Sequence, residues 1–234
     1  MIQFIFIDLD DTVLDFRRTE AAALRATLST LLGIEPADEI LSRYREINLE
    51  QWKALERGEV TRETLKTVRF ERLFREMGVG ASPAMAQNLY EKNLSTGHLF
   101  MEGAPGLLHS LYGKYSLYIV SNGTVSVQKS RIASAGIARY FDGIFLSEEL
   151  GAVKPQREFF DACFSKIPQF SPRRAVILGD SLTSDIQGGI NAGIRTCLFV
   201  PHEREQRGDI VPDFEIDRLS QFLDVLKRLN DETA

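Results

Sequence analysis

The chain has 234 residues, of which 44% are hydrophobic and 26% charged, and its 28 basic and 33 acidic side chains give a formal net charge of −5. This length and apolar fraction predict one large domain, or a core domain with a smaller inserted one, and exclude a disordered chain or a coiled-coil rod. The mild acidity argues against partners bound mainly through long-range charge, so neither nucleic acid nor a membrane is an expected partner.

Several features predict a cytoplasmic location. The first apolar run, residues 2–7, stops at Asp8 and is too short for a secretory signal or a membrane span. The two cysteines, Cys163 and Cys197, lie in apolar-patterned segments and are predicted to be buried free thiols rather than a disulfide or metal ligands. The histidines are scattered and lack the spacing of a zinc site.

Five short apolar runs have the pattern of strands that are buried on both faces. They cover residues 2–7, 117–120, 143–146, 175–178 and 194–200. Helical patterns over 125–135, 155–167 and 184–192 alternate with the later runs, and such alternation requires right-handed crossovers in a parallel sheet. We therefore predict a doubly wound α/β core whose ligand site lies at the carboxyl ends of the strands.

The interval between the first and second predicted strands shows no strand pattern. Apolar residues recur there at helical spacing and predict four helices, one of which begins after Thr61, a predicted N-cap. We predict an all-helical cap domain at residues 15–98. It is inserted into an α/β catalytic core made of residues 1–14 and 99–234.

Four short polar elements fall at ends of predicted strands or at a helix start. They are Asp8-Leu9-Asp10-Asp11-Thr12, Ser121-Asn122-Gly123, Val153-Lys154-Pro155 and Gly179-Asp180-Ser181-Leu182-Thr183-Ser184-Asp185. The topology brings all four to one edge of the sheet, so four acids, Asp8, Asp10, Asp180 and Asp185, gather around one lysine, Lys154.

Such a cluster of acids needs a compensating cation. Two carboxylates about 4 Å apart repel by roughly 4 kcal/mol at an effective dielectric constant near 20. Oxygen ligands without histidine or cysteine favour Mg²⁺. The turn at Asn122-Gly123 lets backbone amides approach a ligand closely, which makes residues 121–123 a suitable seat for a phosphate.

Each element alone also has a purely structural explanation. Aspartates at strand ends often cap a following helix or form an Asx-turn. We interpret Asp11 as a turn residue and Thr12 as a group that makes a local hydrogen bond. The occurrence of all four elements together favours a functional site.

The four elements, in this order and at these strand ends, resemble the four sequence motifs of the haloacid dehalogenase superfamily of phosphotransferases. The resemblance covers nearly the whole chain, including the helical cap. Within the cap, residues 47–61 resemble the bacterial 5′-nucleotidases that act on pyrimidine and noncanonical nucleoside monophosphates.

The resemblance implies a role for each site residue. Asp8 would be the nucleophile that forms an aspartyl-phosphate, and Asp10 would act first as acid and then as base. Lys154 would neutralise charge on the nucleophile and the phosphate. The phosphate would be bound by Ser121, Asn122, Gly123 and Lys154. Mg²⁺ would be held by Asp8, the backbone carbonyl of Asp10 and Asp180, with Asp185 acting through water or as support.

The implied function is a Mg²⁺-dependent phosphomonoester hydrolase that acts on a small phosphorylated substrate, a nucleoside monophosphate. Haloacid dehalogenases offer one alternative, but they lack the second acid because a halide ion leaves without a proton, so Asp10 favours a phosphoester. A phosphatase or mutase for a sugar phosphate or phosphoglycolate keeps the same motifs and stays open. A non-catalytic phosphoacceptor or binding protein is the remaining alternative; phosphoacceptor receiver domains share the acids, hydroxyl and lysine but carry no cap.

Overall fold

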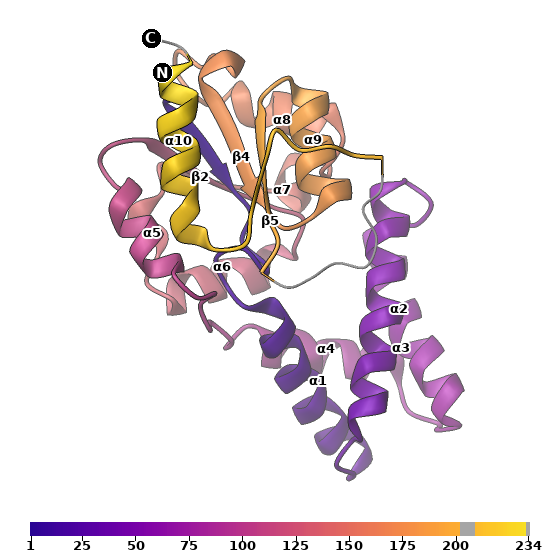
Figure 1. The fold of residues 1–234 in the computed structure, drawn as a ribbon. Coiled ribbons are helices and arrows are strands. Elements are labelled where there is room, and N and C mark those ends of the chain that lie inside the picture. The colour runs from indigo at the N-terminus through magenta and orange to yellow at the C-terminus, as the bar shows by residue number, and fades with distance from the viewer. Residues whose placement is uncertain (202–208, 233–234) are drawn as a thin grey trace. The chain divides into compact units, whose positions relative to one another are not determined.

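The computed structural model describes residues 1–201 and 209–232, and it divides into two compact units (Figure 1). The core unit comprises residues 1–16, 99–125 and 135–234, and the helical unit comprises residues 17–98 and 126–134. The domain boundaries 1–14, 99–234 and 15–98 stay a prediction. The helical unit takes in residues 126–134 as well, which the strand and helix alternation assigns to the core. His202, one of the scattered histidines, lies outside the described residues.

The core unit is built on a parallel sheet with the strand order β3-β2-β1-β4-β5-β6. Its strands are β1 (Phe4–Ile7), β2 (Ser116–Ser121), β3 (Gly143–Leu146), β4 (Ala175–Gly179), β5 (Arg195–Phe199) and β6 (Phe214–Ile216). The order along the chain reverses at the junction of β1 and β4, where doubly wound sheets bind their ligands. The predicted fold class is confirmed. Strand β6 was not predicted because it is only three residues long and has one exposed member, Glu215.

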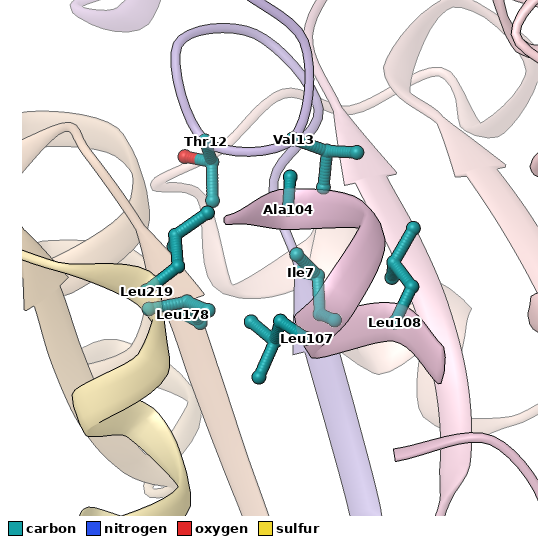
Figure 2. Close-up of a pocket in the computed structure, with 8 residues that line it drawn as sticks. All are labelled: Ile7, Thr12, Val13, Ala104, Leu107, Leu108, Leu178 and Leu219. Atoms are coloured by element: carbon teal, nitrogen blue, oxygen red, sulfur yellow. The ribbon is translucent and has the colours of Figure 1, made fainter. Parts of the chain in front are cut away.

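Helices cover both faces of this sheet, which explains why its central strands are continuous apolar runs. Side chains alternate along β1, so Phe4 and Phe6 face one side, where they join a buried cluster with Phe159 and Phe160 of α8 (Arg157–Phe164). On the other face, Ile7 packs in an apolar pocket with residues of α5 (Ala104–Leu111). Figure 2 shows this pocket, which is lined by Ile7, Thr12, Val13, Ala104, Leu107, Leu108, Leu178 and Leu219.

The remaining elements of the core unit are short, apart from the final helix. They are α7 (Ser147–Leu150), α9 (Gln187–Ala192), α10 (Phe222–Asp231), 3₁₀ turns at Ala138–Tyr140, Pro172–Arg174 and Leu219–Gln221, and a π-helical turn at Leu182–Ile186. Cys163 in α8 and Cys197 in β5 are both buried and unpaired, as predicted. Within the described ranges, no helix is long and apolar enough to cross a membrane.

The helical unit contains the four helices that the sequence predicted, together with most of α6 (Val125–Ser134). The four are α1 (Phe16–Leu32), α2 (Asp38–Glu56), α3 (Arg62–Met77) and α4 (Pro83–Leu94). The predicted N-cap is confirmed, because the hydroxyl of Thr61 accepts a 3.2 Å hydrogen bond from the amide of Thr64. Two side chains tie α6 to the segment after α4: Ser130 donates to the carbonyl of Ser95, and the Arg131 Nε donates to the carbonyl of Gly97.

A buried chain of polar side chains joins α1, α2, α3 and α4. Asn48 donates to the carboxylate of Glu20 at 2.7 Å. Arg69 donates to Asn48 at 2.8 Å and to Gln87 at 2.8 Å, and its guanidinium lies 4.9 Å from the ring centroid of Tyr90. The four linked residues, Glu20, Asn48, Arg69 and Gln87, come from four different helices, so the network connects all four helices of the bundle.

Candidate active site

The candidate site lies at the carboxyl ends of three adjacent strands. Asp8 follows β1, Ser121 ends β2, and Asp180 follows β4, and β1 pairs with both of the others. The amide of Asp8 donates to the carbonyl of Leu178 at 2.9 Å, so the sheet's hydrogen bonding continues as far as this acid. The predicted convergence of these elements therefore has a simple cause in the strand order.

Lys154 occupies the centre of the site. Its Nζ donates to Asp8 Oδ1 at 2.6 Å, to Asp185 Oδ1 at 2.6 Å and to the carbonyl of Val120 at 2.9 Å. The side chains of Lys154 and Asp185 are each 1% exposed. An ammonium group has three hydrogens, and the Lys154 ammonium donates to three protein acceptors. All of its hydrogens are therefore used in this arrangement.

Burial and the neighbouring charges shift the pKa values of this group. Burial raises the pKa of Asp8 well above its ordinary value; Lys154 opposes the shift, and the carboxylates of Asp185 and Asp10 add to it. Burial acts to lower the pKa of Lys154, but Asp185 and Asp8 outweigh it and raise that pKa. The lysine therefore stays charged, and Asp8 holds its proton more tightly than an exposed aspartate does.

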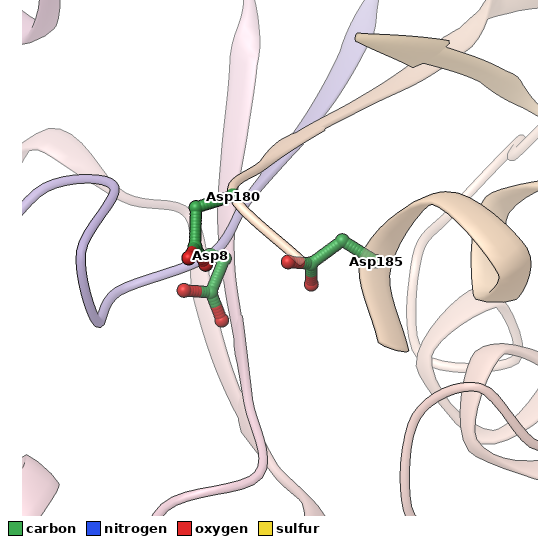
Figure 3. Close-up of side chains that lie close together, drawn as sticks. All are labelled: Asp8, Asp180 and Asp185. Atoms are coloured by element: carbon green, nitrogen blue, oxygen red, sulfur yellow. The ribbon is translucent and has the colours of Figure 1, made fainter. Parts of the chain in front are cut away.

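Three of the predicted acids come together. Carboxylate oxygens of Asp8, Asp180 and Asp185 lie within 4.8 Å of one another (Figure 3). The side chain of the fourth predicted acid, Asp10, is not part of this group, although its charge contributes to the pKa shift of Asp8. The three clustered carboxylates are the hard oxygen donors that suit a divalent cation such as Mg²⁺.

Asp185 is held on both sides by protein donors. Its Oδ1 accepts from Lys154, and its Oδ2 accepts from the backbone amide of Ser181 at 3.0 Å. Ser181 also caps the π-helical turn that carries Asp185, because its hydroxyl accepts from the amide of Ser184 at 3.2 Å. The position of Asp185 is thus fixed by the loop after β4.

The loop after β2 is also ordered by its own side chains. The hydroxyl of Ser121 accepts from the amide of Gly123 at 3.1 Å. The side-chain nitrogen of Asn122 donates to the carbonyl of Lys154, and the amide of Lys154 donates to Asn122 Oδ1, both at 2.9 Å. Residues 121–123 and Lys154 are therefore neighbours, as the sequence predicts.

The loop after β1 differs from the prediction at one residue. Asp11 adopts a φ of 56°, which fits its interpretation as a turn residue because aspartate tolerates the left-handed region better than most residues. Thr12, however, was expected to make a local hydrogen bond, and that prediction is wrong. Among the residues that the structure describes, its buried hydroxyl has no hydrogen-bond partner, and it lies beside the apolar pocket of Figure 2.

A model of the haloacid dehalogenase-like hydrolases matches residues 5–199, which run from β1 to the end of β5 and include every predicted site residue. The chain belongs to the haloacid dehalogenase-like hydrolase family. The resemblance that the four motifs predicted is confirmed.

Similar proteins match this haloacid dehalogenase-like hydrolase over nearly its whole length. YfnB of Bacillus subtilis, named as an HAD-hydrolase, is 37% identical over 95% of this chain and 94% of its own. Its magnesium-bound crystal structure superposes with a TM-score of 0.91, covering 96% of this chain and 98% of that one. The pyrimidine 5′-nucleotidase PynA of Streptococcus pneumoniae is 34% identical over 97% of this chain and 95% of its own. The pyrimidine 5′-nucleotidase YjjG of Escherichia coli is 29% identical over 95% and 97%.

Sequence reasoning missed the side chains that support this hydrolase's loops. Glu148 accepts a 2.8 Å hydrogen bond from the amide of Val125, Gln156 accepts from the amide of Val153 at 3.1 Å, and Asn191 donates to the carbonyl of Pro155 at 2.9 Å. The only signal for Gln156 was its place directly after the Lys-Pro element. The other two residues lie far from their partners along the chain, so nothing local could have indicated them.

Proposed function

We propose that this protein is a Mg²⁺-dependent phosphomonoester hydrolase that works through an aspartyl-phosphate on Asp8 and acts on nucleoside monophosphates. One observation carries the proposal. A buried lysine bridges Asp8 and Asp185 beside Asp180, and a further acid, Asp10, follows Asp8 by two residues. This set supplies a nucleophile, a positive charge, a cation site and a proton donor in one place.

The residues of the site fit a magnesium ion. Asp8 and Asp180 would bind it together with the backbone carbonyl of Asp10, and the ion would neutralise the excess negative charge of the acids and of the phosphate. Both oxygens of Asp185 already accept hydrogen bonds from protein donors, which favours a supporting role through water for this residue.

The proposed reaction has two displacements at phosphorus. A carboxylate oxygen of Asp8 bonds to phosphorus as the ester P–O bond breaks, and the carboxyl of Asp10 gives its proton to the departing alkoxide. The Asp10 carboxylate then takes a proton from water, whose oxygen bonds to phosphorus as the Asp8–phosphorus bond breaks. Inorganic phosphate leaves, and Asp8 and Asp10 return to their starting states.

Several groups of the chain would hold the phosphate. The backbone amides of residues 121–123 and the hydroxyl of Ser121 lie at the end of β2, next to β1. Lys154 would neutralise charge on both the nucleophile and the phosphate. Its three hydrogens are already donated, so contact with a phosphate oxygen requires one of its bonds to the carboxylates or to Val120 to be exchanged.

The nucleoside monophosphate assignment is supported by the two relatives that are named as pyrimidine 5′-nucleotidases. The presence of Asp10 as a proton donor favours a phosphoester substrate over a haloacid, because a departing halide ion needs no proton. A phosphatase or mutase for a sugar phosphate or phosphoglycolate is the second candidate, since it would use the same acids and lysine. The expected partner is a small phosphorylated molecule, and the expected location is the cytoplasm, in keeping with two buried free thiols.

A hydrolysis panel tests the proposal. The protein is assayed with Mg²⁺ on nucleoside monophosphates, sugar phosphates, phosphoglycolate and a 2-haloacid, and kcat/KM is compared by release of phosphate, isomeric product or halide. We expect the highest kcat/KM for a pyrimidine nucleoside monophosphate. Preference for another phosphoester would overturn the substrate assignment alone, and halide release without phosphate release would overturn the reaction class.

Two variants and chelation test the mechanism. Asp8→Asn should lower kcat by at least about 10³-fold, because the nucleophile is lost. Asp11→Asn is the matched control: it removes an acid from the same loop, and asparagine tolerates the observed φ of 56°. Chelation with EDTA should abolish activity and Mg²⁺ should restore it. Full activity in Asp8→Asn or after chelation contradicts the mechanism.

A further inference from the structure

The side chain of Asn122 and the main chain of Lys154 form a closed ring of two hydrogen bonds. Asn122 Nδ2 donates to the carbonyl of Lys154, and the amide of Lys154 donates to Asn122 Oδ1, each over 2.9 Å. The two residues are 32 positions apart in the sequence, so the ring joins the loop after β2 to the loop before α8. The side-chain amide of Asn122 thus pairs with the backbone N–H and C=O of Lys154, as a peptide group of a neighbouring strand pairs with a residue in a β-sheet.

We propose that Asn122 is a positioning residue, which sets the place of Lys154 through this ring instead of contacting the substrate with its own side chain. The inference rests on the proposed function, because it assigns the means by which the central lysine of that site is held. It assigns the Asn122 side chain a role different from the phosphate binding that the sequence predicted.

The ring matters because it fixes one end of a long side chain whose other end carries the charge. The Lys154 ammonium is bound by Asp8, Asp185 and the carbonyl of Val120. Val120 belongs to β2 and Asn122 directly follows β2, so Lys154 is tied to the end of that strand at both its backbone and its ammonium. Without the hydrogen bonds to the Lys154 backbone, only the contacts of the ammonium would hold the flexible four-carbon side chain of Lys154 in place. Ordering that side chain costs rotamer entropy.

The carboxamide of asparagine meets both requirements of the ring. It must give one hydrogen and accept one at a fixed separation, which a carboxylate or a hydroxyl does not do. Aspartate would keep the acceptor for the Lys154 amide but would place a second acceptor against the Lys154 carbonyl. Alanine would remove both bonds and leave two backbone groups unpaired.

The test measures the hydrogen bond of the Lys154 amide and the catalytic effect of losing it separately, in the full-length protein. Amide hydrogen exchange by NMR reports the Lys154 N–H, and steady-state kinetics with Mg²⁺ and the preferred nucleoside monophosphate report kcat and KM. In Asn122→Ala we expect exchange at Lys154 to accelerate about tenfold or more and kcat to fall about 10–100-fold, as for other residues that orient a catalytic group. KM should change little. Asn122→Asp, which is nearly isosteric, should also lower kcat and serves if the alanine variant does not fold.

Gln156→Ala is the matched control. Gln156 accepts a hydrogen bond from the amide of Val153, the residue just before Lys154, and lies in the same loop. Its removal should accelerate exchange at Val153 while leaving exchange at Lys154 and kcat unchanged. A fall of kcat in this control equal to that in Asn122→Ala would show that any loosening of the loop suffices, and would overturn the specific role of Asn122.

A double-mutant cycle decides whether Asn122 acts through Lys154. In a Lys154→Met background, Asn122→Ala should lower residual activity much less than in the wild type, because the group that it positions is gone. Equal effects in both backgrounds, wild-type kcat in a folded Asn122 variant, or a raised KM at constant kcat would overturn the inference. If the wild-type protein hydrolyses no phosphoester, the proposed function fails, whereas the exchange rate of the Lys154 amide still decides whether the tie exists.

Discussion

Gly179 and Asp185 lie so close together that no side chain fits at position 179. A Cβ atom built on Gly179 would stand 2.3 Å from both Cγ and Oδ2 of Asp185, far inside normal contact distance. Gly179 is the last residue of β4 and directly precedes Asp180. Because position 179 is a glycine, the carboxylate of Asp185, which binds Lys154, can pack against the backbone at the end of β4. Asp180, a second acid of the site, directly follows this strand.

The first prediction follows from this contact. Gly179→Ala should displace Asp185 and, with it, the hydrogen bond to Lys154, so we expect kcat to fall about 100-fold, the cost of misplacing a catalytic group by about 1 Å. Stability should fall by about 1–3 kcal/mol because of overpacking. Both are measured by steady-state kinetics and urea unfolding of the same preparation.

Gly189→Ala is the control for this prediction. A Cβ there would lie 2.6 Å from Thr196 and 2.7 Å from Ile177, so it also overpacks the core, but it touches no acid of the site. It should lose stability while keeping kcat. Equal loss of kcat in both variants would contradict the view that Gly179 acts through Asp185.

The second prediction concerns the unpartnered hydroxyl of Thr12. Since this group is buried and has no hydrogen bond to any part of the chain that the structure describes, Thr12→Val should leave the free energy of unfolding unchanged or raise it by about 1 kcal/mol. Thr27→Val is the contrasting case, because the Thr27 hydroxyl donates to the carbonyl of Ala23 at 2.7 Å and accepts from Asn93 at 3.0 Å. That variant should lose about 1 kcal/mol. A larger loss of unfolding free energy for Thr12→Val than for Thr27→Val, measured by urea unfolding, would contradict the conclusion that the Thr12 hydroxyl makes no stabilising hydrogen bond.

Sequence patterns predicted what depends on periodicity and on chain topology. Runs such as Phe4–Ile7 have to lie between two layers of helices, and a parallel sheet brings Asp8, Ser121 and Asp180 to one edge. Periodicity could not predict the network that joins Glu20, Asn48, Arg69 and Gln87. Polar side chains are assigned to solvent by default, and only the packing of the four helices shows that these are paired with one another in the interior.

The same limit applies to contacts between distant segments of the chain. The ring between Asn122 and Lys154 depends on the separation of two loops, which spacing within either loop does not contain. The clash that excludes a side chain at Gly179 likewise depends on the path of the π-helical turn six residues later, at Asp185. Strand β6 was missed for a different reason, because a three-residue edge strand has too few residues to show alternation.

The third prediction concerns the two thiols. Burial raises the pKa of Cys163 to about 12 and that of Cys197 to about 12, from an ordinary value of 9.0. Because the thiolate is the reactive form, each native thiol at pH 8 has about 10³-fold less thiolate than an exposed one. An aromatic disulfide reagent should therefore label neither cysteine in the native protein and both in guanidinium. Rapid labelling of a cysteine in the folded protein at pH 8 would show that the thiol is accessible.

The fourth prediction is a pH dependence of stability that originates at Glu20. Burial raises the pKa of Glu20 above its ordinary value of 4.5, and Arg45 opposes the shift only in part. The folded state therefore holds this proton more tightly than the unfolded state does. The stability that Glu20 contributes is fully present below pH 4.5 and is lost as the pH rises through the raised pKa.

Glu20→Gln removes this titration and keeps an oxygen that can accept the hydrogen bond from Asn48. The variant should therefore gain stability relative to the wild type as the pH rises from 4 to 7, measured as the difference in urea unfolding free energies. Glu35→Gln should show the opposite trend, because a hydrogen bond from Arg25 lowers the pKa of Glu35. The stability of the wild type relative to this variant should therefore increase as the pH rises. A flat difference for Glu20→Gln across this range would mean that the carboxyl titrates alike in the folded and unfolded states.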